Sequence, residues 1–194
     1  IVMELVRGRL LRELIHEGNV EISRSVKFVS GILTALEVSH SAGVVHRDIK
    51  PANVMVVDAD QVKVMDFGIA RAVSDNSATQ AATAGIVGTA QYFSPEQARG
   101  ESVDARTDLY STGVLLYEML AGRPPFIGET AVSVAYQHVN ELVTPPSAHN
   151  SNISASLDEV VLHSLAKDRN ERYQSAESFR EHLLAAALAP VESE

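Results

Sequence analysis

The sequence predicts an α+β fold that is mainly α-helical and contains short hairpin strands. Apolar residues recur at helical spacing in the segment 23–43, at positions 26, 29, 32, 33 and 36. Four later segments have helical patterns as well, at roughly 107–121, 130–139, 156–166 and 175–188. Two valine-rich runs, 54–57 and 62–65, flank the polar residues 58–61, which is typical of a β-hairpin.

The ends of the first elements follow from their local residues. The apolar run from Ile1 to Val6 predicts a strand that ends at Gly8. Ser23 is the expected N-cap of the next helix, and Gly43 is its expected stop. Residues 71–88 are rich in Ala, Ser, Thr and Gly and have almost no large apolar side chains, which predicts a mobile loop.

Composition favours one compact domain and excludes some classes of partner. The 194 residues are 45% apolar and 21% charged, enough for one substantial core. A net charge of −9 argues against nucleic acid as a partner. No apolar run approaches the length of a membrane span, so we expect this segment to make no membrane contact. The absence of cysteine suits the reducing cytoplasm.

The most informative feature is the run HRDIKPAN at 46–53, followed after twelve residues by Asp66-Phe67-Gly68. Eight identities are fixed in these two motifs, and a chance match has a probability of about 10 to the minus 10. Together they supply a proton acceptor, a cation that can face phosphate, and two oxygen ligands for a metal. As isolated residues Asp48, Asn53 and Asp66 would be ordinary turn formers, but their joint spacing favours phosphoryl transfer.

Further motifs follow in a fixed order. They are Gly88-Thr89, Ser94-Pro95-Glu96, Asp108-Leu109-Tyr110-Ser111 and Arg172. With the first two motifs, this series resembles the protein-kinase family over essentially the whole chain. The segments DFGIAR, GTAQYFSPEQARG, VDARTDLYS and VSVAYQHV are more narrowly similar to bacterial (actinobacterial-like) receptor-type Ser/Thr kinases of the PASTA class.

The resemblance implies a protein-kinase-like fold, of which residues 1–189 are the larger C-terminal lobe. It implies an activation segment at 66–96 and the start of a linker at 190–194. The 194 residues contain no glycine-rich loop, strand lysine or partnering helix glutamate. We therefore expect the N-lobe to be absent here and supplied in cis by a longer parent chain, which also carries any membrane anchor. The isolated segment is expected to be inactive.

The resemblance assigns roles to the residues of the motifs. Asp48 would accept or orient the proton of the substrate hydroxyl, and Lys50 would offset charge on the transferred γ-phosphoryl of ATP. Thr89 would bond to both side chains. Tyrosine kinases usually lack a lysine at the position of Lys50, so protein Ser or Thr is the expected acceptor. Ala90, Gln91 and Tyr92 would shape the pocket for the residue that follows the phosphoacceptor.

A nucleotide site is also implied. Asn53 and Asp66 would hold Mg²⁺, or Mn²⁺, against the phosphates. The backbone of Glu4 and Val6 would contact adenine, with Met3 as gatekeeper. Met55 would form the floor under the base, backed by Leu11, Leu115 and Met119; without the motif beside it, Met55 could equally be core filler.

Regulatory and structural roles complete the set. Arg47 and Arg71 would bind a phosphorylated threonine of the 71–88 loop, with Thr83 the first choice and Thr79 the second. A second kinase copy is an expected partner for autophosphorylation. The structural residues are His46 and Phe67 as packing residues, Gly68 of the second motif, Asp108 bonded to backbone amides of the HRD turn, and a buried ion pair of Glu96 with Arg172.

A second function stays open on the sequence alone. The lobe could be a non-catalytic scaffold or binding module that docks partners through the helix 130–139 or a phosphorylated loop. The intact set of Asp48, Lys50, Asn53 and Asp66 favours catalysis, because sites that are no longer used lose such costly polar clusters first.

Overall fold

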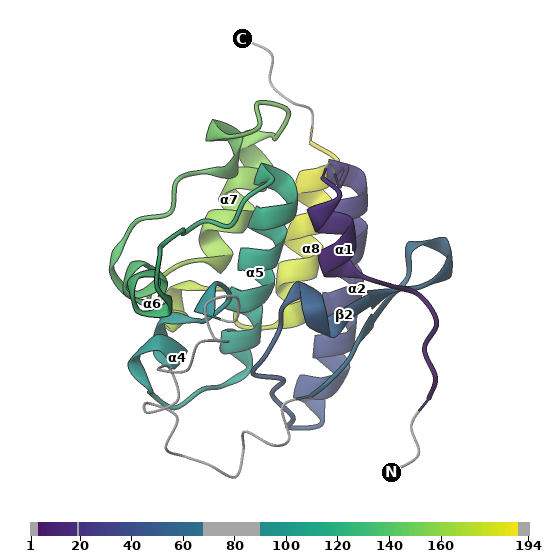
Figure 1. The fold of residues 1–194 in the computed structure, drawn as a ribbon, viewed down its shortest axis with the longest axis horizontal. Coiled ribbons are helices and arrows are strands. Elements are labelled where there is room, and N and C mark those ends of the chain that lie inside the picture. The colour runs from purple at the N-terminus through teal and green to yellow at the C-terminus, as the bar shows by residue number, and fades with distance from the viewer. Residues whose placement is uncertain (1–3, 19, 68–89, 190–194) are drawn as a thin grey trace.

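A computed structural model describes residues 4–18, 20–67 and 90–189, and shows a helical body with a small sheet on one side (Figure 1). Within those residues the sheet has three antiparallel strands in the order β1-β2-β3. The model agrees with the predicted mainly helical α+β class. In the described part of the chain, no helix is long and apolar enough to cross a membrane.

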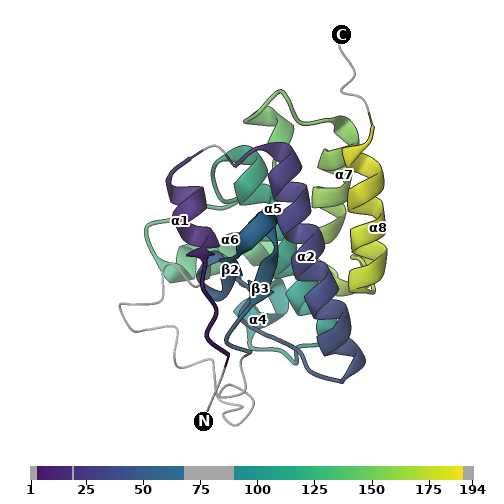
Figure 2. The same ribbon diagram turned by 90° about the vertical axis from the view of Figure 1, so that its right-hand side faces the viewer.

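Two helices form the centre of the core. They are α2 (Ile22–Ser41) and α5 (Ala105–Ala121), which pack against each other. All the predicted apolar positions of α2 are buried, and α5 is buried almost all round because other elements surround it. Helix α8 (Ala176–Ala187) lies along α2, and α7 (Ala155–Ser164) packs on both α5 and α8 (Figure 2).

The predicted hairpin is present. Strand β2 (Val54–Val56) pairs with β3 (Val62–Val64), so that Met55 lies opposite Lys63. The turn between them includes Asp60 in the left-handed region at φ 59°. Arg24 of α2 donates to both carboxylate oxygens of Asp60, at 2.8 and 3.3 Å, which fixes the turn on the core.

The predicted strand from Ile1 to Val6 is wrong for its described part. Glu4 to Arg7 form no regular element, and the strand in this region is β1 (Arg9–Leu10), which pairs with Val56 and Met55 of β2. The described residues before β1 extend past the end of β2, where no described strand offers hydrogen bonds. Apolar composition alone therefore misplaced the strand.

Three short helices complete the part of the fold that the structure describes. Neither α1 (Leu11–His16) nor α4 (Pro95–Arg99) was predicted, because five or six residues are too few for a periodic pattern. Helix α6 (Ala131–Asn140) lies close to its predicted position and packs against α4. There are also single 3₁₀ turns, at Pro51–Asn53, Asp58–Asp60, Pro146–Ala148 and Arg169–Glu171.

The observed helix ends can be compared with the predicted bounds and caps. The long helices lie within about two residues of the predicted bounds, as is usual for helix ends. Ser23 is not the N-cap of α2: the N-cap is Glu21, and no side chain caps this end. Gly43 does stop the helix, with φ at 74°, a conformation that costs glycine little.

Candidate active site

The HRD turn follows α2 and is fixed by one buried carboxylate of α5. Asp108 accepts hydrogen bonds from the backbone N–H groups of His46 and Arg47, each at 2.8 Å. Its third partner is the Nε2 atom of His40, also at 2.8 Å. Arg47 has φ at 67°, so these bonds stabilise a backbone conformation that a non-glycine residue rarely adopts. The expected bonds of Asp108 are present, whereas the contribution of His40 was not predicted.

His46 joins the two sequence motifs. Its buried ring bonds to the carbonyl of Met65 through Nε2 at 2.9 Å and lies 4.6 Å from the ring of Phe67. Because a carbonyl only accepts, Nε2 carries the proton, and Nδ1 is left to accept from the N–H of Asp48 at 3.2 Å. The imidazole thus sets the position of both loops.

Two polar side chains of the first motif converge on one carboxylate oxygen of Asp48. Oδ2 of Asp48 accepts from Nζ of Lys50 at 2.8 Å and from Nδ2 of Asn53 at 3.0 Å. Nδ2 of Asn53 also donates to the backbone carbonyl of Asp48, at 2.9 Å. The two bonds of the Asn53 amide use its nitrogen, so its Oδ1 atom is the end that can serve as a metal ligand.

Asp66 stands beside this group. The N–H of Met65 donates to the carbonyl of Asn53 at 2.8 Å, which brings the next residue to the same edge. Asp66 is exposed, has φ at 55°, and has no hydrogen bond or ion pair with any other described residue. One carboxylate and one amide oxygen suit Mg²⁺, which takes few protein ligands and keeps substrate phosphates and water. Within the described ranges, no cluster of three or more His, Cys, Asp or Glu forms an all-protein metal cage.

The expected nucleotide side is built around β2. Met55 is half-buried, and the residues expected behind it, Leu11, Leu115 and Met119, are buried in the core. Gly8 packs so closely on β2 that a Cβ there would come within 2.3 Å of the carbonyl oxygen of Val56. Glu4 is exposed and its carboxylate bonds to Lys63. Val6 is half-buried, and Met3 lies outside the described residues.

Residues 90–93, on the expected acceptor side, are held by side chains that were not predicted from the sequence. The hydroxyl of Tyr92 donates to Glu118 at 2.6 Å, and Ser111 donates to the carbonyl of Tyr92 at 2.7 Å. Burial raises the pKa of Glu118, an effect that the bond from Tyr92 partly offsets. Burial and the nearby Glu118 carboxylate also raise the pKa of Tyr92 well above its usual range.

Helix α4 connects this region to the HRD turn. Ser94 and Gln97 form a capping box at its N-terminus. Nε2 of Gln97 then donates to the backbone carbonyl of Arg47 at 2.8 Å. The side chains of Asp108 and Gln97 therefore hold the N–H and the carbonyl of one residue, immediately before Asp48.

The expected ion pair of Glu96 with Arg172 is present and buried. Two parallel bonds join the guanidinium and the carboxylate, at 2.8 and 2.9 Å, and Thr107 donates to the same carboxylate at 2.7 Å. Burial opposes the charge on Glu96, but hydrogen bonds from Arg172 and Thr107 and the charge of Arg172 outweigh it and lower the pKa.

Some expected site residues lie outside the described part of the chain. These are Gly68, Arg71, Thr79, Thr83 and Thr89. Arg47, the other expected phosphate ligand, is half-buried, and no described acceptor bonds to its guanidinium.

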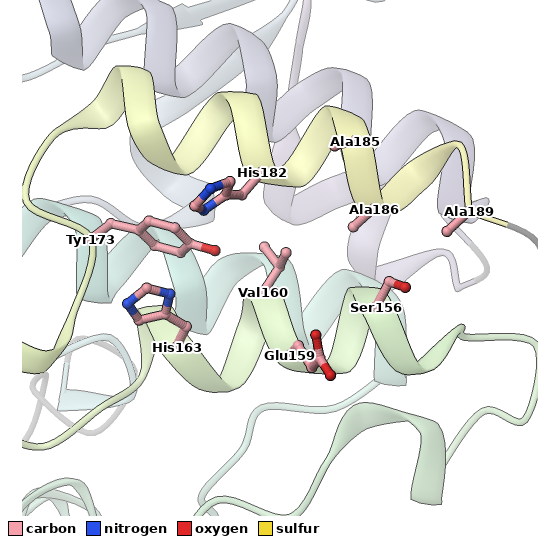
Figure 3. A pocket seen from close by; sticks show the side chains of 9 residues that line it. All are labelled: Ser156, Glu159, Val160, His163, Tyr173, His182, Ala185, Ala186 and Ala189. Carbon is pink, nitrogen blue, oxygen red and sulfur yellow. The ribbon is translucent and has the colours of Figure 1, made fainter.

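Two cavities have other residues in their walls, with Glu96 of the buried ion pair as the one expected site residue among them. The larger one, of about 440 Å³, opens between α7 and α8, where the ring of Tyr173 lies between His163 and His182 (Figure 3). The second, of about 340 Å³, has charged walls: Glu96, Arg99, Glu101, Lys167, Asp168, Arg169 and Asn170. Neither of these two is lined by Asp48, Asn53 or Asp66, and the candidate site is identified by the chemistry of its motif residues.

Comparison with known proteins gives one consistent result. The protein kinase domain family matches residues 1–184. A probable serine/threonine-protein kinase of Streptomyces coelicolor is 58% identical over 181 residues, covering 93% of this chain and 27% of the relative. Serine/threonine-protein kinase PknB of Mycobacterium tuberculosis is 53% identical over 185 residues, covering 95% of this chain and 30% of the relative. The chain thus spans less than a third of the length of these relatives.

Proposed function

The chain belongs to the protein kinase domain family, and on that premise we propose that residues 1–189 form the larger lobe of a serine/threonine protein kinase. The lobe would take part in transfer of the γ-phosphoryl of ATP to Ser or Thr hydroxyls of protein substrates. Residues 66–96 would be its activation segment, and 190–194 the start of a linker.

The observation that carries the proposal is the convergence of Lys50 and Asn53 on one oxygen of Asp48. Both contacts orient the Asp48 carboxylate, which would accept or orient the proton of the attacking hydroxyl. The ammonium of Lys50 would lie beside the transferred group and offset its charge. A lysine here favours Ser and Thr acceptors, and the names of the similar bacterial proteins support the same class.

ATP with Mg²⁺ is the proposed nucleotide, with Mn²⁺ as an alternative cation. When bound, it would supply the transferable phosphoryl group and the cation that neutralises the phosphates. Oδ1 of Asn53 and the carboxylate of Asp66 would hold the metal. The backbone of Glu4 and Val6 would contact adenine, over the side chain of Met55.

The test is phosphoryl transfer by the full-length protein that contains these residues, measured with labelled ATP on casein and on the protein itself. The Asp48→Asn variant should lose activity by about 10²-fold or more, since a positioned proton acceptor contributes about 10²–10⁴-fold. Asp58→Asn, an exposed change in the hairpin turn, is the matched control and should retain activity. Equal activity of Asp48→Asn and the wild type would refute the catalytic assignment.

Activation would depend on loop phosphorylation. Arg47 and Arg71 would bind a phosphate on Thr83 or Thr79, through charge-assisted hydrogen bonds. A second copy of the kinase could supply that phosphate in trans. The double variant Thr79→Ala/Thr83→Ala should have reduced activity, whereas the exposed change Ser151→Ala should not. Full activity in the double variant would contradict this mode of activation.

The 194 residues by themselves should transfer little phosphoryl. The sequence contains no glycine-rich loop to cover the phosphates and no strand lysine to bind them. We expect less than about 1% of the full-length rate in the same assay.

A further inference from the structure

Side chains from two helices, α5 and α6, form hydrogen bonds with the backbone of residues 90–93. The N–H of Phe93 donates to the carbonyl of Ala90 at 3.2 Å, which closes a turn. The two carbonyls inside that turn each contact one side chain. Ser111 of α5 bonds to the carbonyl of Tyr92, and His138 of α6 bonds to the carbonyl of Gln91 at 3.0 Å.

The chemistry of His138 fixes the direction of its bonds. Burial and the nearby charge of Lys167 lower the pKa of His138 to about 3, so the imidazole is neutral near pH 7. A neutral imidazole has one donor nitrogen and one acceptor nitrogen. The carbonyl of Gln91 can only accept, so Nε2 carries the proton. Nδ1 must then accept from the hydroxyl of Tyr110, at 2.9 Å.

The surroundings of His138 are rigid. Its ring is completely buried and meets the ring of Phe126 edge-on, with centroids 4.9 Å apart. Nζ of Lys167 donates to the carbonyls of Gln137 and His138 at the C-terminal end of α6, at 3.2 and 2.8 Å. The carbonyl of Gln137 also accepts from the N–H of Glu141 at 3.0 Å, whereas the carbonyl of His138 is one that the helix itself leaves unpaired. Both the backbone and the side chain of His138 are therefore held in place.

We propose that His138 is a positioning residue for the protein acceptor, because its Nε2–H group fixes the Gln91 carbonyl and with it the shape of segment 90–93. Tyr110 supports this role by donating to Nδ1, which stabilises the tautomer that carries its proton on Nε2. The inference rests on the proposed kinase function, in which this segment shapes the pocket for the residue that follows the phosphoacceptor. Loss of the bond should weaken acceptor binding and leave nucleotide binding unchanged.

The experiment uses the full-length protein and three variants. His138→Phe keeps a buried ring and removes both hydrogen bonds. His138→Gln restores an N–H donor at a similar position. Tyr110→Phe removes only the hydroxyl that donates to Nδ1 of His138, and serves if His138→Phe does not fold. Val132→Ala, on the exposed face of α6, is the control.

The first measurement is hydrogen exchange of the backbone amides in 90–93, which needs no enzyme activity. Exchange should accelerate by about fivefold to tenfold in His138→Phe, the size expected for loss of one hydrogen bond. It should accelerate in the same direction but less in Tyr110→Phe. It should stay near the wild-type rate in His138→Gln and Val132→Ala.

The second measurement is steady-state kinetics with an acceptor peptide selected with the wild-type enzyme. KM for the peptide should rise about fivefold to tenfold in His138→Phe and recover in His138→Gln. KM for ATP should stay within about twofold in all variants, a split that general loss of structure would not give. Unchanged exchange in both His138→Phe and Tyr110→Phe would overturn the inference. If the wild-type protein transferred no phosphoryl but the variants showed the expected hydrogen-exchange pattern, the proposed kinase function would be wrong and the positioning role of His138 would stand.

Discussion

Asp108 accepts a hydrogen bond of 2.8 Å from the backbone N–H of Arg47, a residue whose φ is 67°. The carboxylate lies on a buried helix, and Arg47 lies in the loop that presents Asp48. A left-handed conformation at a non-glycine residue costs about 1–3 kcal/mol and persists only where its surroundings fix it. The core helix α5 thus fixes the backbone immediately before Asp48.

Asp108→Asn should therefore affect both stability and activity. The amide has only one acceptor oxygen, so one of the two backbone N–H groups loses its partner. We expect the free energy of unfolding to fall by about 2–4 kcal/mol. Phosphoryl transfer should fall by about 10²-fold, since small displacements of a catalytic group have effects of that size. Urea unfolding and the labelled-ATP assay measure the two effects. Wild-type values for both would show that the carboxylate does not order the loop.

Glu96→Gln should destabilise the protein in a pH-dependent way. It leaves the charge of Arg172 buried without a counter-ion, which costs about 3–5 kcal/mol near pH 7. The pKa of Glu96 is lowered on folding, so its contribution is complete above the ordinary carboxyl value of 4.5 and is lost as the pH falls through the lower folded value. Unfolding free energies of variant and wild type should converge in acid. If the difference in unfolding free energy stayed constant down to the lowest pH at which both proteins fold, the ionised Glu96 carboxylate would not be its cause.

The sequence predicted those parts of the fold that have a local signal. Helix α5 followed from its apolar pattern, and the hairpin from two valine-rich runs around a polar turn. Residues Ile1 to Val6 have the composition of a strand, but strand formation also needs a neighbour, and β2 ends before it reaches the described residues Glu4 to Val6. Helix α1 has too few residues to show a period.

The candidate site was predictable to the extent that it lies in compact motifs. Asp48 and Asn53 are five positions apart, and a single turn of the chain is enough to bring their side chains into contact. The bond from Gln97 to Arg47 joins residues 50 positions apart, and that between His138 and Gln91 joins residues 47 apart. Such contacts depend on how helices pack, and neither glutamine nor a single histidine carries a local pattern that reveals its partner.

Two variants of Gln97 should separate its two roles. Gln97→Glu keeps an oxygen that can accept from the N–H of Ser94, so the capping box survives. It loses the donor to the carbonyl of Arg47 and places a carboxylate beside that oxygen. We expect kcat to fall by about tenfold, with a change in unfolding free energy below about 1 kcal/mol.

Gln97→Ala should lose both the cap and the bond, so that activity falls and stability falls by about 1 kcal/mol. Steady-state kinetics and thermal unfolding on the same preparations distinguish the two variants. Unchanged kcat in both would mean that α4 does not position the HRD turn.

Glu118→Gln should leave the protein as stable as the wild type near pH 7, or more stable by up to about 1 kcal/mol. Burial raises the pKa of Glu118, so its favourable contribution is present below 4.5 and is lost as the pH rises through the higher folded value. The glutamine has no charge to bury and still accepts from the hydroxyl of Tyr92. Glu118→Leu removes that acceptor and should cost about 1–3 kcal/mol at any pH. Urea unfolding between pH 4 and 8 measures both, and a large loss in Glu118→Gln at pH 7 would mean that the ionised carboxylate stabilises the fold.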